Sequence, residues 1–255
     1  MIKILIVLIL SQLMINASYL PKNFVKAKTI ATRLYYTTHL ESFYTETTLK
    51  PTVYIYKKKF PYKPMLVLQL GMVKSPYEGS KYVLRGQKIE WEHVVPASWF
   101  VTIDDDSLKQ AYYEGDDKCV TSGGDEYKGR KCAEKVSKIF NLMESDLYNL
   151  VPVIGALNAL RVNKPYCIIE GEEREFGENI DVEINKKCIE IQENKRGDVA
   201  RIMLYMNKKY GIQFPDHNTT KEMLLQWAED DPEDDWEKEK KDILNKVYGM
   251  EFTND

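Results

Sequence analysis

Glu92 and His93 are the residues whose types and spacing point most directly to chemistry, because a carboxylate and an imidazole adjoin in IEWEHVVPAS, residues 89–98. Asn149 is the third residue of interest and lies in DLYNLVPVIGALNALRVN, residues 146–163. Mg²⁺ is a hard ion that accepts one or two protein oxygens and completes its octahedron with water and phosphate oxygens. An imidazole with a pKa of about 6.5 can remove a proton from an attacking water. The set therefore predicts metal-assisted hydrolysis, with one Mg²⁺ held by Glu92 and Asn149 and with His93 as the general base.

Phosphodiester hydrolysis is the reaction that this set suits, because negative oxygens shield the phosphorus and the departing alkoxide is a poor leaving group. A metal ion offsets the charge on both groups. A guanidinium beside the phosphate would supply a further positive group, and Arg130 and Arg161 are the candidates.

Each of the three residues also has a purely structural interpretation. Glu92 could be an exposed strand carboxylate, His93 a buried, hydrogen-bonded imidazole, and Asn149 a helix cap. Neighbours in a regular strand point to opposite faces. Glu92 and His93 can therefore serve one site only if the strand ends there, and Pro96 close behind favours such an end.

The first 18 residues have the pattern of a secretory signal peptide. Lys3 precedes the apolar run at residues 4–10, and small residues follow at 16–18. A retained membrane anchor is the alternative, but the run is shorter than the roughly 20 apolar residues that a span needs. We therefore expect cleavage and a mature nuclease-like chain, residues 19–255, that forms one domain, is periplasmic or secreted, and has no contact with a membrane.

Four cysteines are present, and an even number in an exported chain favours disulfides. Local pairing of Cys119 with Cys132 and of Cys167 with Cys188 is the simplest of the three possible connectivities. A zinc site built from all four is the rival interpretation, but the sequence has no CxxC spacing to support it.

The net charge of −3 is divided unevenly along the chain. Residues 21–100 carry 13 Lys and Arg against 5 Asp and Glu, a balance of +8, whereas residues 170–255 carry 13 against 23, a balance of −10. A polyanion responds to the local field rather than to the sum. The positive third also contains Glu92 and His93, which favours a nucleic acid as the substrate.

Contacts to nucleic acid are predicted at Lys57, Lys58 and Lys59, where aromatic residues alternate with lysines in KKKFPYK. Such a patch can bind phosphates and stack bases, although a solvated strand end would look the same. The further candidates for nucleic-acid contacts are Arg85, Asn158 and Arg161.

The remaining pattern predicts several helices and short strands around this centre. We expect helices at 23–38, 135–142, after Asn149 with Pro152 in the first turn, at 198–210 up to Gly211, after a capping box of Thr219 with Glu222, and from 236 to Gly249. We expect a strand at 52–56, a short apolar run at 65–70 between turns, and a stretch at 82–91 that leads up to Glu92 and His93. We also expect a surface loop at 104–129 and two short strands within 167–188 around a turn at 171–177.

Successive motifs of the chain resemble those of the bacterial endonuclease I family. They are WEHVVPAS, KGRKCAEK from Lys128, ESDLYNLVPVIGALNALRVN from Glu144, RGDVARIMLYM from Arg196, LQW at 225–227 and DWEKEKKDILNKVYG from Asp235. The resemblance implies an α+β fold with a ββα-metal (His-Me finger) core. It also implies an exported, non-specific endonuclease of DNA and RNA that leaves 5′-phosphate ends and needs disulfides.

The resemblance assigns roles by position. Glu92 and Asn149 match the Mg²⁺ ligands, His93 matches the general base, and Arg130 in KGRKCA matches the arginine that steadies the phosphate. The chain departs from the family where FYTE at 43–46 and FGENI at 176–180 lack cysteines often found there. These departures affect the expected number of disulfides and not the metal site.

We therefore expect an exported, monomeric, Mg²⁺-dependent endonuclease of double- and single-stranded DNA and of RNA, to which Ca²⁺ or Mn²⁺ can also bind. The main alternative is a catalytically silent extracellular nucleic-acid-binding protein on the same fold. A glycosidase that uses Glu90 and Glu92 is a more distant alternative, which rests on the spacing of the two carboxylates alone.

Overall fold

The computed structural model describes residues 20–46, 48–54, 63–68, 85–86, 88–171, 174, 176–177, 180–214 and 219–252. The predicted signal peptide and the lysines at 57–59 lie outside these residues. The described part is a mixed α+β structure, as expected, with three separate antiparallel pairs of strands. None of its helices combines the length and the apolar character of a membrane span.

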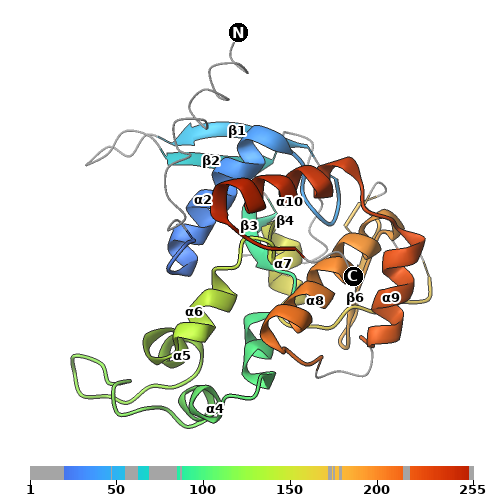
Figure 1. The fold of residues 1–255 in the computed structure, drawn as a ribbon. Coiled ribbons are helices and arrows are strands. Elements are labelled where there is room, and N and C mark those ends of the chain that lie inside the picture. The colour runs from blue at the N-terminus through green and yellow to red at the C-terminus, as the bar shows by residue number, and fades with distance from the viewer. Residues whose placement is uncertain are drawn as a thin grey trace.

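The helices are α2 (Phe24–Thr38), α4 (Asp106–Tyr113), α5 (Arg130–Val136), α6 (Lys138–Glu144), α7 (Gly155–Arg161), α8 (Arg196–Tyr210), α9 (Lys221–Asp230) and α10 (Asp235–Tyr248), with 3₁₀ turns at Ala97–Thr102 and Glu193–Lys195. The strand pairs are β1 (Leu49–Tyr54) with β2 (Lys63–Leu68), β3 (Ile89–His93) with β4 (Leu150–Ile154), and β5 (Val182–Ile184) with β6 (Ile189–Ile191). Figure 1 shows β3 and β4 near the centre of the molecule, with α4, α5 and α6 below them and α8 and α9 to their right.

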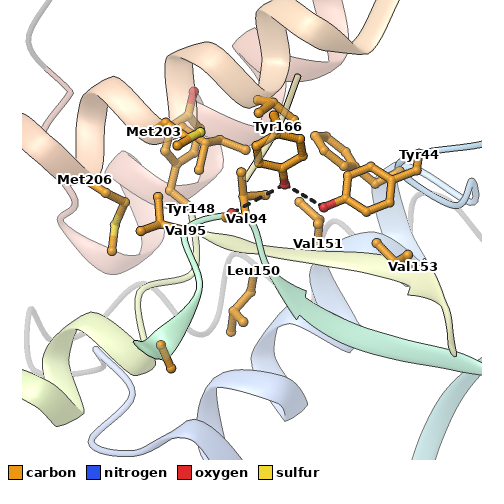
Figure 2. Packing of buried hydrophobic residues seen from close by; sticks show 14 of the residues in the cluster. Tyr44, Val94, Val95, Tyr148, Leu150, Val151, Val153, Tyr166, Met203 and Met206 are labelled. Atoms are coloured by element: carbon orange, nitrogen blue, oxygen red, sulfur yellow. Dashed lines mark hydrogen bonds between the residues drawn. The ribbon is translucent and has the colours of Figure 1, made fainter. Parts of the chain in front are cut away.

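The hydrophobic core surrounds the β3–β4 ribbon. Figure 2 shows part of it, with the buried residues Val94, Val95, Leu150, Val151, Val153, Met203 and Met206. Two buried tyrosines cross this region, and the hydroxyls of Tyr44 and Tyr166 lie 2.6 Å apart. Tyr166 donates to the carbonyl of Val94 at 3.3 Å, just beyond the end of β3. The backbone that follows β3 is thereby tied to the core.

Three of the predicted helices are confirmed together with their end signals. The Asn23 side chain caps α2 by accepting a hydrogen bond from the Lys26 amide at 3.0 Å. Gly211 and Gly249 end α8 and α10 with φ values of 75° and 63°, in the left-handed region that glycine adopts most readily.

The helix predicted to follow Asn149 directly is wrong, because residues 150–154 form strand β4. All five residues of LVPVI are buried, and they pair with β3. Pro152 lies opposite Trp91, a position whose amide points away from the partner strand, so the missing N–H costs no ladder hydrogen bond. Helix α7 begins only at Gly155.

Two further predictions on the 104–142 region need correction. The expected surface loop contains helix α4, which Asp105 caps by accepting from the Leu108 amide at 2.9 Å. The single helix expected at 135–142 is divided into α5 and α6 at Ser137, whose hydroxyl accepts from the Phe140 amide at 3.2 Å. In both places a short polar side chain, Asp105 or Ser137, begins a helix by accepting a hydrogen bond from a backbone amide of the first turn.

The C-terminal half departs from prediction at two local points. The two short strands lie at 182–184 and 189–191, so their turn follows residue 184 rather than spanning 171–177. Thr220 and not Thr219 caps α9, because the Thr219 hydroxyl accepts from the Tyr166 amide at 3.0 Å. Both predicted disulfides, Cys119–Cys132 and Cys167–Cys188, are present.

Asp146 joins the segment before β4 to helix α8. One carboxylate oxygen accepts from the Tyr148 amide at 2.9 Å. The other accepts from the hydroxyls of Tyr205 at 3.0 Å and Tyr210 at 2.7 Å, and from the Lys209 ammonium at 2.9 Å. The carboxylate is buried, so these donors replace the water that an exposed carboxylate would bind.

We expect Asp146→Ala to lower the free energy of unfolding by at least about 3 kcal/mol, because several hydrogen bonds to one charged group are lost together. Urea unfolding followed by circular dichroism measures this change. Asp242→Ala is the control, because Asp242 is exposed and pairs with Lys246 one turn further on, a contact worth about 0.3–0.5 kcal/mol. Equal losses in the two variants would contradict the role given to Asp146.

Candidate active site

The β3–β4 ribbon brings the predicted metal ligands onto one face. Glu92 lies opposite Val151, and the Val94 amide extends the ribbon by donating to the Asn149 carbonyl at 3.1 Å. Asn149 precedes Val151 by two positions, so strand alternation puts it on the same face as Glu92, in the diagonal position. The two residues are thus neighbours across the strands although they are far apart in the sequence.

The Asn149 side chain is held by the backbone of a single residue, Val95. Its amide oxygen accepts from the Val95 amide at 2.7 Å, and its amide nitrogen donates to the Val95 carbonyl at 3.1 Å. The side chain is fully buried. This pair of bonds fixes which end of the amide is oxygen, and a carbonyl-type oxygen keeps a second lone pair for a cation.

The Glu92 carboxylate is buried and forms an ion pair with Arg161 through Oε1. Burial raises the pKa of Glu92, and the Arg161 guanidinium opposes that rise. No hydrogen bond from a described residue reaches the second oxygen, Oε2. One carboxylate oxygen and one amide oxygen on the same face are a donor set that suits a hard divalent cation, so the residues present fit the Mg²⁺ that the resemblance implies.

Arg161, at the end of α7, lies behind Glu92. Besides the ion pair, its guanidinium donates to the carbonyls of His93 and Val94, both at 2.7 Å, and lies over the Tyr166 ring at 4.6 Å. Its side chain is 0% exposed, so it offers no surface to a phosphate. The structure therefore gives it a supporting position rather than the nucleic-acid contact expected from the sequence.

The His93 ring is oriented by one backbone carbonyl. Its Nε2 lies 2.8 Å from the Glu144 carbonyl oxygen, which can only accept, so Nε2 carries the proton and Nδ1 has the free lone pair. Burial, with smaller contributions from the nearby cations of Arg130, Arg161 and Lys28, lowers the pKa of His93 to about 3, against the opposing effect of the Glu144 carbonyl. The imidazole is therefore neutral at pH 7, the form that can accept a proton.

Strand β3 ends at His93, as expected from the sequence, but the side chains of Glu92 and His93 still point to opposite sides of the strand. The Glu92 carboxylate contacts α7 through Arg161, whereas the His93 ring packs against Phe24 of α2 at 4.7 Å and against Phe100 at 5.9 Å. The Glu92 carboxylate and the His93 imidazole can therefore contact one substrate only if the substrate lies across the end of the β3–β4 ribbon.

Arg130 begins α5, and its side chain is 41% exposed. Its Nε donates to Glu144 Oε1 at 2.6 Å and to Glu134 Oε1 at 3.1 Å. Glu144 thus orients His93 through its carbonyl and Arg130 through its carboxylate. Burial raises the pKa of Glu144 to about 7, and Arg130 opposes the rise.

Glu144 is the functional residue that sequence reasoning missed. It opens the quoted motif ESDLYN, and that position was the only available signal. Its carbonyl contact with His93 spans 51 positions and leaves no mark on residue type.

Arg85 and Asn158, two further residues predicted to contact nucleic acid, converge on Glu90. Arg85 Nε donates to Glu90 Oε1 at 2.8 Å, and Asn158 Nδ2 donates to Oε2 at 3.1 Å. Glu90 is therefore engaged by two partners, which weakens the interpretation of Glu90 and Glu92 as a free carboxylate pair. The lysines at 57–59 lie outside the described residues.

One cluster of three acidic groups lies elsewhere in the described part of the chain, at Asp198, Asp234 and Glu237. Lys195 Nζ lies 3.2 Å from Asp198, and Arg201 pairs with both Asp198 and Glu237. Lys195 also lies 4.0 Å from Asp234, so every carboxylate of the cluster is paired with a cation, and the cluster is an ionic network between α8 and α10 rather than a rival metal site.

Comparison with known proteins matches the sequence model of the Endonuclease I family over residues 21–251. The chain is 33% identical over 175 residues to Endonuclease-1 of Buchnera aphidicola subsp. Acyrthosiphon pisum, which covers 68% of this chain and 61% of that protein. It is 31% identical over 176 residues to an extracellular and to a periplasmic deoxyribonuclease of Aeromonas hydrophila, covering 68% and 65% of them.

The aligned part is thus less than two thirds of the Buchnera relative. The family match nevertheless begins before α2 and ends after α10, so it includes every element that contributes to the site described above. The resemblance seen in the motifs is confirmed: the chain belongs to the Endonuclease I family.

Proposed function

We propose that the chain is an exported, divalent-metal-dependent endonuclease that hydrolyses phosphodiester bonds of DNA, and of RNA, with little sequence preference. The observation that carries the proposal is the arrangement at the end of the β3–β4 ribbon. A buried carboxylate and a fixed amide oxygen share one face there, and a neutral imidazole lies at the same strand end. The names of the Aeromonas relatives, which are deoxyribonucleases, support DNA as the substrate.

The order of elements supports a ββα-metal core made of β3, β4 and α7. Two antiparallel strands are followed directly by a helix, which returns Asn158 and Arg161 to the strand that carries Glu90 and Glu92. The helix thereby fixes the carboxylate face of the ribbon. The long insertion between the two strands supplies Arg130 and Glu144.

Each residue has a distinct task in the proposed reaction. Mg²⁺, held by Glu92 and Asn149, would offset charge on the scissile phosphate and on the departing oxygen. Nδ1 of His93 takes the proton of the attacking water, because Nε2 is occupied by the Glu144 carbonyl. The exposed Arg130 guanidinium donates hydrogen bonds to a non-bridging phosphate oxygen as charge develops there.

Export to the periplasm or the medium is part of the proposal. The two disulfides suit an oxidising compartment, and the Aeromonas relatives are named extracellular and periplasmic. We retain 5′-phosphate products as an expectation from the resemblance, and a cleaved signal peptide at residues 1–18 as an expectation from the sequence pattern.

Removal of divalent metal is the first test. Purified protein incubated with plasmid should convert it to linear and smaller products in Mg²⁺, should leave it intact in EDTA, and should recover when Mg²⁺ is restored in excess. Agarose electrophoresis gives the result. Retardation of the plasmid without any cleavage would favour the alternative of a silent binding protein, and cleavage that persists in EDTA would contradict the metal-dependent mechanism.

We expect His93→Ala to lower the cleavage rate by about 10²–10⁴-fold, the range that a general base contributes. DNA binding should be retained, because the imidazole acts on water and not on the phosphate backbone. His39→Ala is the matched control, because His39 stacks on Trp236 at 4.6 Å, away from the ribbon end. Wild-type turnover by the His93 variant, measured on a fluorescent oligonucleotide, would exclude the general-base role.

We expect Glu92→Gln to raise the Mg²⁺ concentration for half-maximal cleavage by at least about tenfold, a loss of about 1.4 kcal/mol of binding free energy. Glutamine preserves the volume and an acceptor for Arg161, so unfolding is less of a risk than with alanine. Glu90→Gln removes a charge from the same strand and serves as the control. A Mg²⁺ titration with identical midpoints for both variants would refute the ligand role of Glu92.

A further inference from the structure

The Phe24 ring, in the first turn of α2, is a common contact of three charged or catalytic groups. Its centroid lies 4.7 Å from that of the His93 ring. The Lys28 ammonium lies 4.3 Å from the same centroid, and the Arg130 guanidinium carbon lies 5.2 Å from it. Lys28 follows Phe24 by four positions and therefore lies one helical turn above it. The Phe24 ring thus contacts Lys28 and Arg130, two cations, as well as His93, the proposed general base.

The two cations differ in how their charge is balanced. Arg130 forms ion pairs with Glu134 and Glu144. Lys28 is only partly buried, and no described residue forms an ion pair or a hydrogen bond with its ammonium. A contact with an aromatic face is a weak attraction and does not neutralise the charge. An uncompensated positive charge thus remains at the ribbon end, beside the group that would act on the substrate.

We propose that Lys28 binds a backbone phosphate of the nucleic acid next to the scissile one, from its place over the Phe24 ring that His93 and Arg130 also contact. The inference deepens the proposed function and rests on it. A nucleic acid fits this site because it carries a row of phosphates, so a second phosphate reaches Lys28 while Arg130 serves the first. A phosphate contact of this kind carries no sequence information, in agreement with a non-specific enzyme.

Lys26 provides a control within the same helix. It is exposed and lies two positions before Lys28, so it points away from the Phe24 ring while carrying the same charge. Lys28→Gln and Lys26→Gln change the net charge equally. A general effect of positive charge on DNA affinity would therefore appear in both variants, whereas a specific phosphate contact would appear only in the first.

The experiment measures DNA affinity by fluorescence anisotropy across a salt series, with a short duplex in EDTA so that no cleavage occurs. For Lys28→Gln, the slope of log Kd against log salt should fall by about 1, the value for one lost phosphate contact. Lys26→Gln should keep the wild-type slope, and Lys28→Arg should restore it. Equal slopes for wild type, Lys28→Gln and Lys26→Gln would overturn the inference.

Thermal unfolding distinguishes a phosphate contact of Lys28 from a role in folding alone. A purely structural role would lower the melting temperature of Lys28→Gln without changing the slope of log Kd against log salt. Cleavage of plasmid by the wild type in Mg²⁺ is scored in parallel. If the wild type cleaves plasmid but Lys28→Gln has the wild-type salt slope, the Lys28 contact is refuted and the enzymatic proposal stands. Binding with the predicted loss of slope but no cleavage in any divalent metal refutes the enzymatic proposal and leaves the phosphate contact in place.

Discussion

The buried ion pair between Arg161 and Glu92 is the interaction on which the rest of the site depends. Removing two charges from water costs several kcal/mol for each ion, and the cost is recovered only when the remaining polar atoms are also satisfied. Arg161 meets part of this condition by donating to the carbonyls of His93 and Val94, although its Nε has no partner in the described structure. Two apolar residues would stabilise the core at least as well, so a functional reason for retaining the charges is required.

In the proposed metal site, that reason is the charge state of Glu92. Burial favours the neutral acid and raises the pKa of this carboxyl, whereas a cation-binding group must be ionised. The Arg161 guanidinium lowers this pKa and so counteracts the effect of burial. It contacts only Oε1 of Glu92, which leaves Oε2 for a ligand. The same guanidinium holds the two carbonyls that end β3. One side chain therefore favours the ionised carboxylate and also holds the backbone at the end of β3.

Local sequence signals predicted the parts of the fold whose causes are local. The Asn23 cap and Gly211 act within one helical turn, and the structure follows them. Strand β4 was missed because Pro152 is equally suited to a first helical turn and to a strand position whose amide faces away from the partner strand. Only pairing with β3 decides between these, and that pairing is not written in residues 150–154 themselves.

The candidate site shows the same division. Residue types and the family resemblance drew attention to Glu92, His93 and Asn149, and the structure brings them to one end of a ribbon. The supporting contacts could not be inferred, because a backbone carbonyl is present in every residue. The Glu144 carbonyl on His93 and the Val95 backbone on Asn149 are of this kind. Arg161, by contrast, has a distinctive side chain, and its burial rather than its type reveals its role.

The segment that carries Glu144 and Asn149 is held by distant parts of the chain. The Ser145 hydroxyl donates to the Pro21 carbonyl at 2.9 Å, before α2 begins. The carboxylate of Asp146 accepts three hydrogen bonds from α8, and Lys240 of α10 donates to the Tyr148 carbonyl at 3.2 Å. Each contact fixes backbone within a few residues of Asn149.

The proposed metal site, with only two protein ligands, would tolerate little displacement of either one, because solvent and substrate must complete the coordination in a fixed geometry. The clamping of residues 144–149 from both ends of the domain supplies that rigidity. The family match, residues 21–251, includes all of these clamping elements. A ribbon with α7 but without α2, α8 and α10 would retain the ligands and lose the contacts that hold Asn149 in register with Glu92.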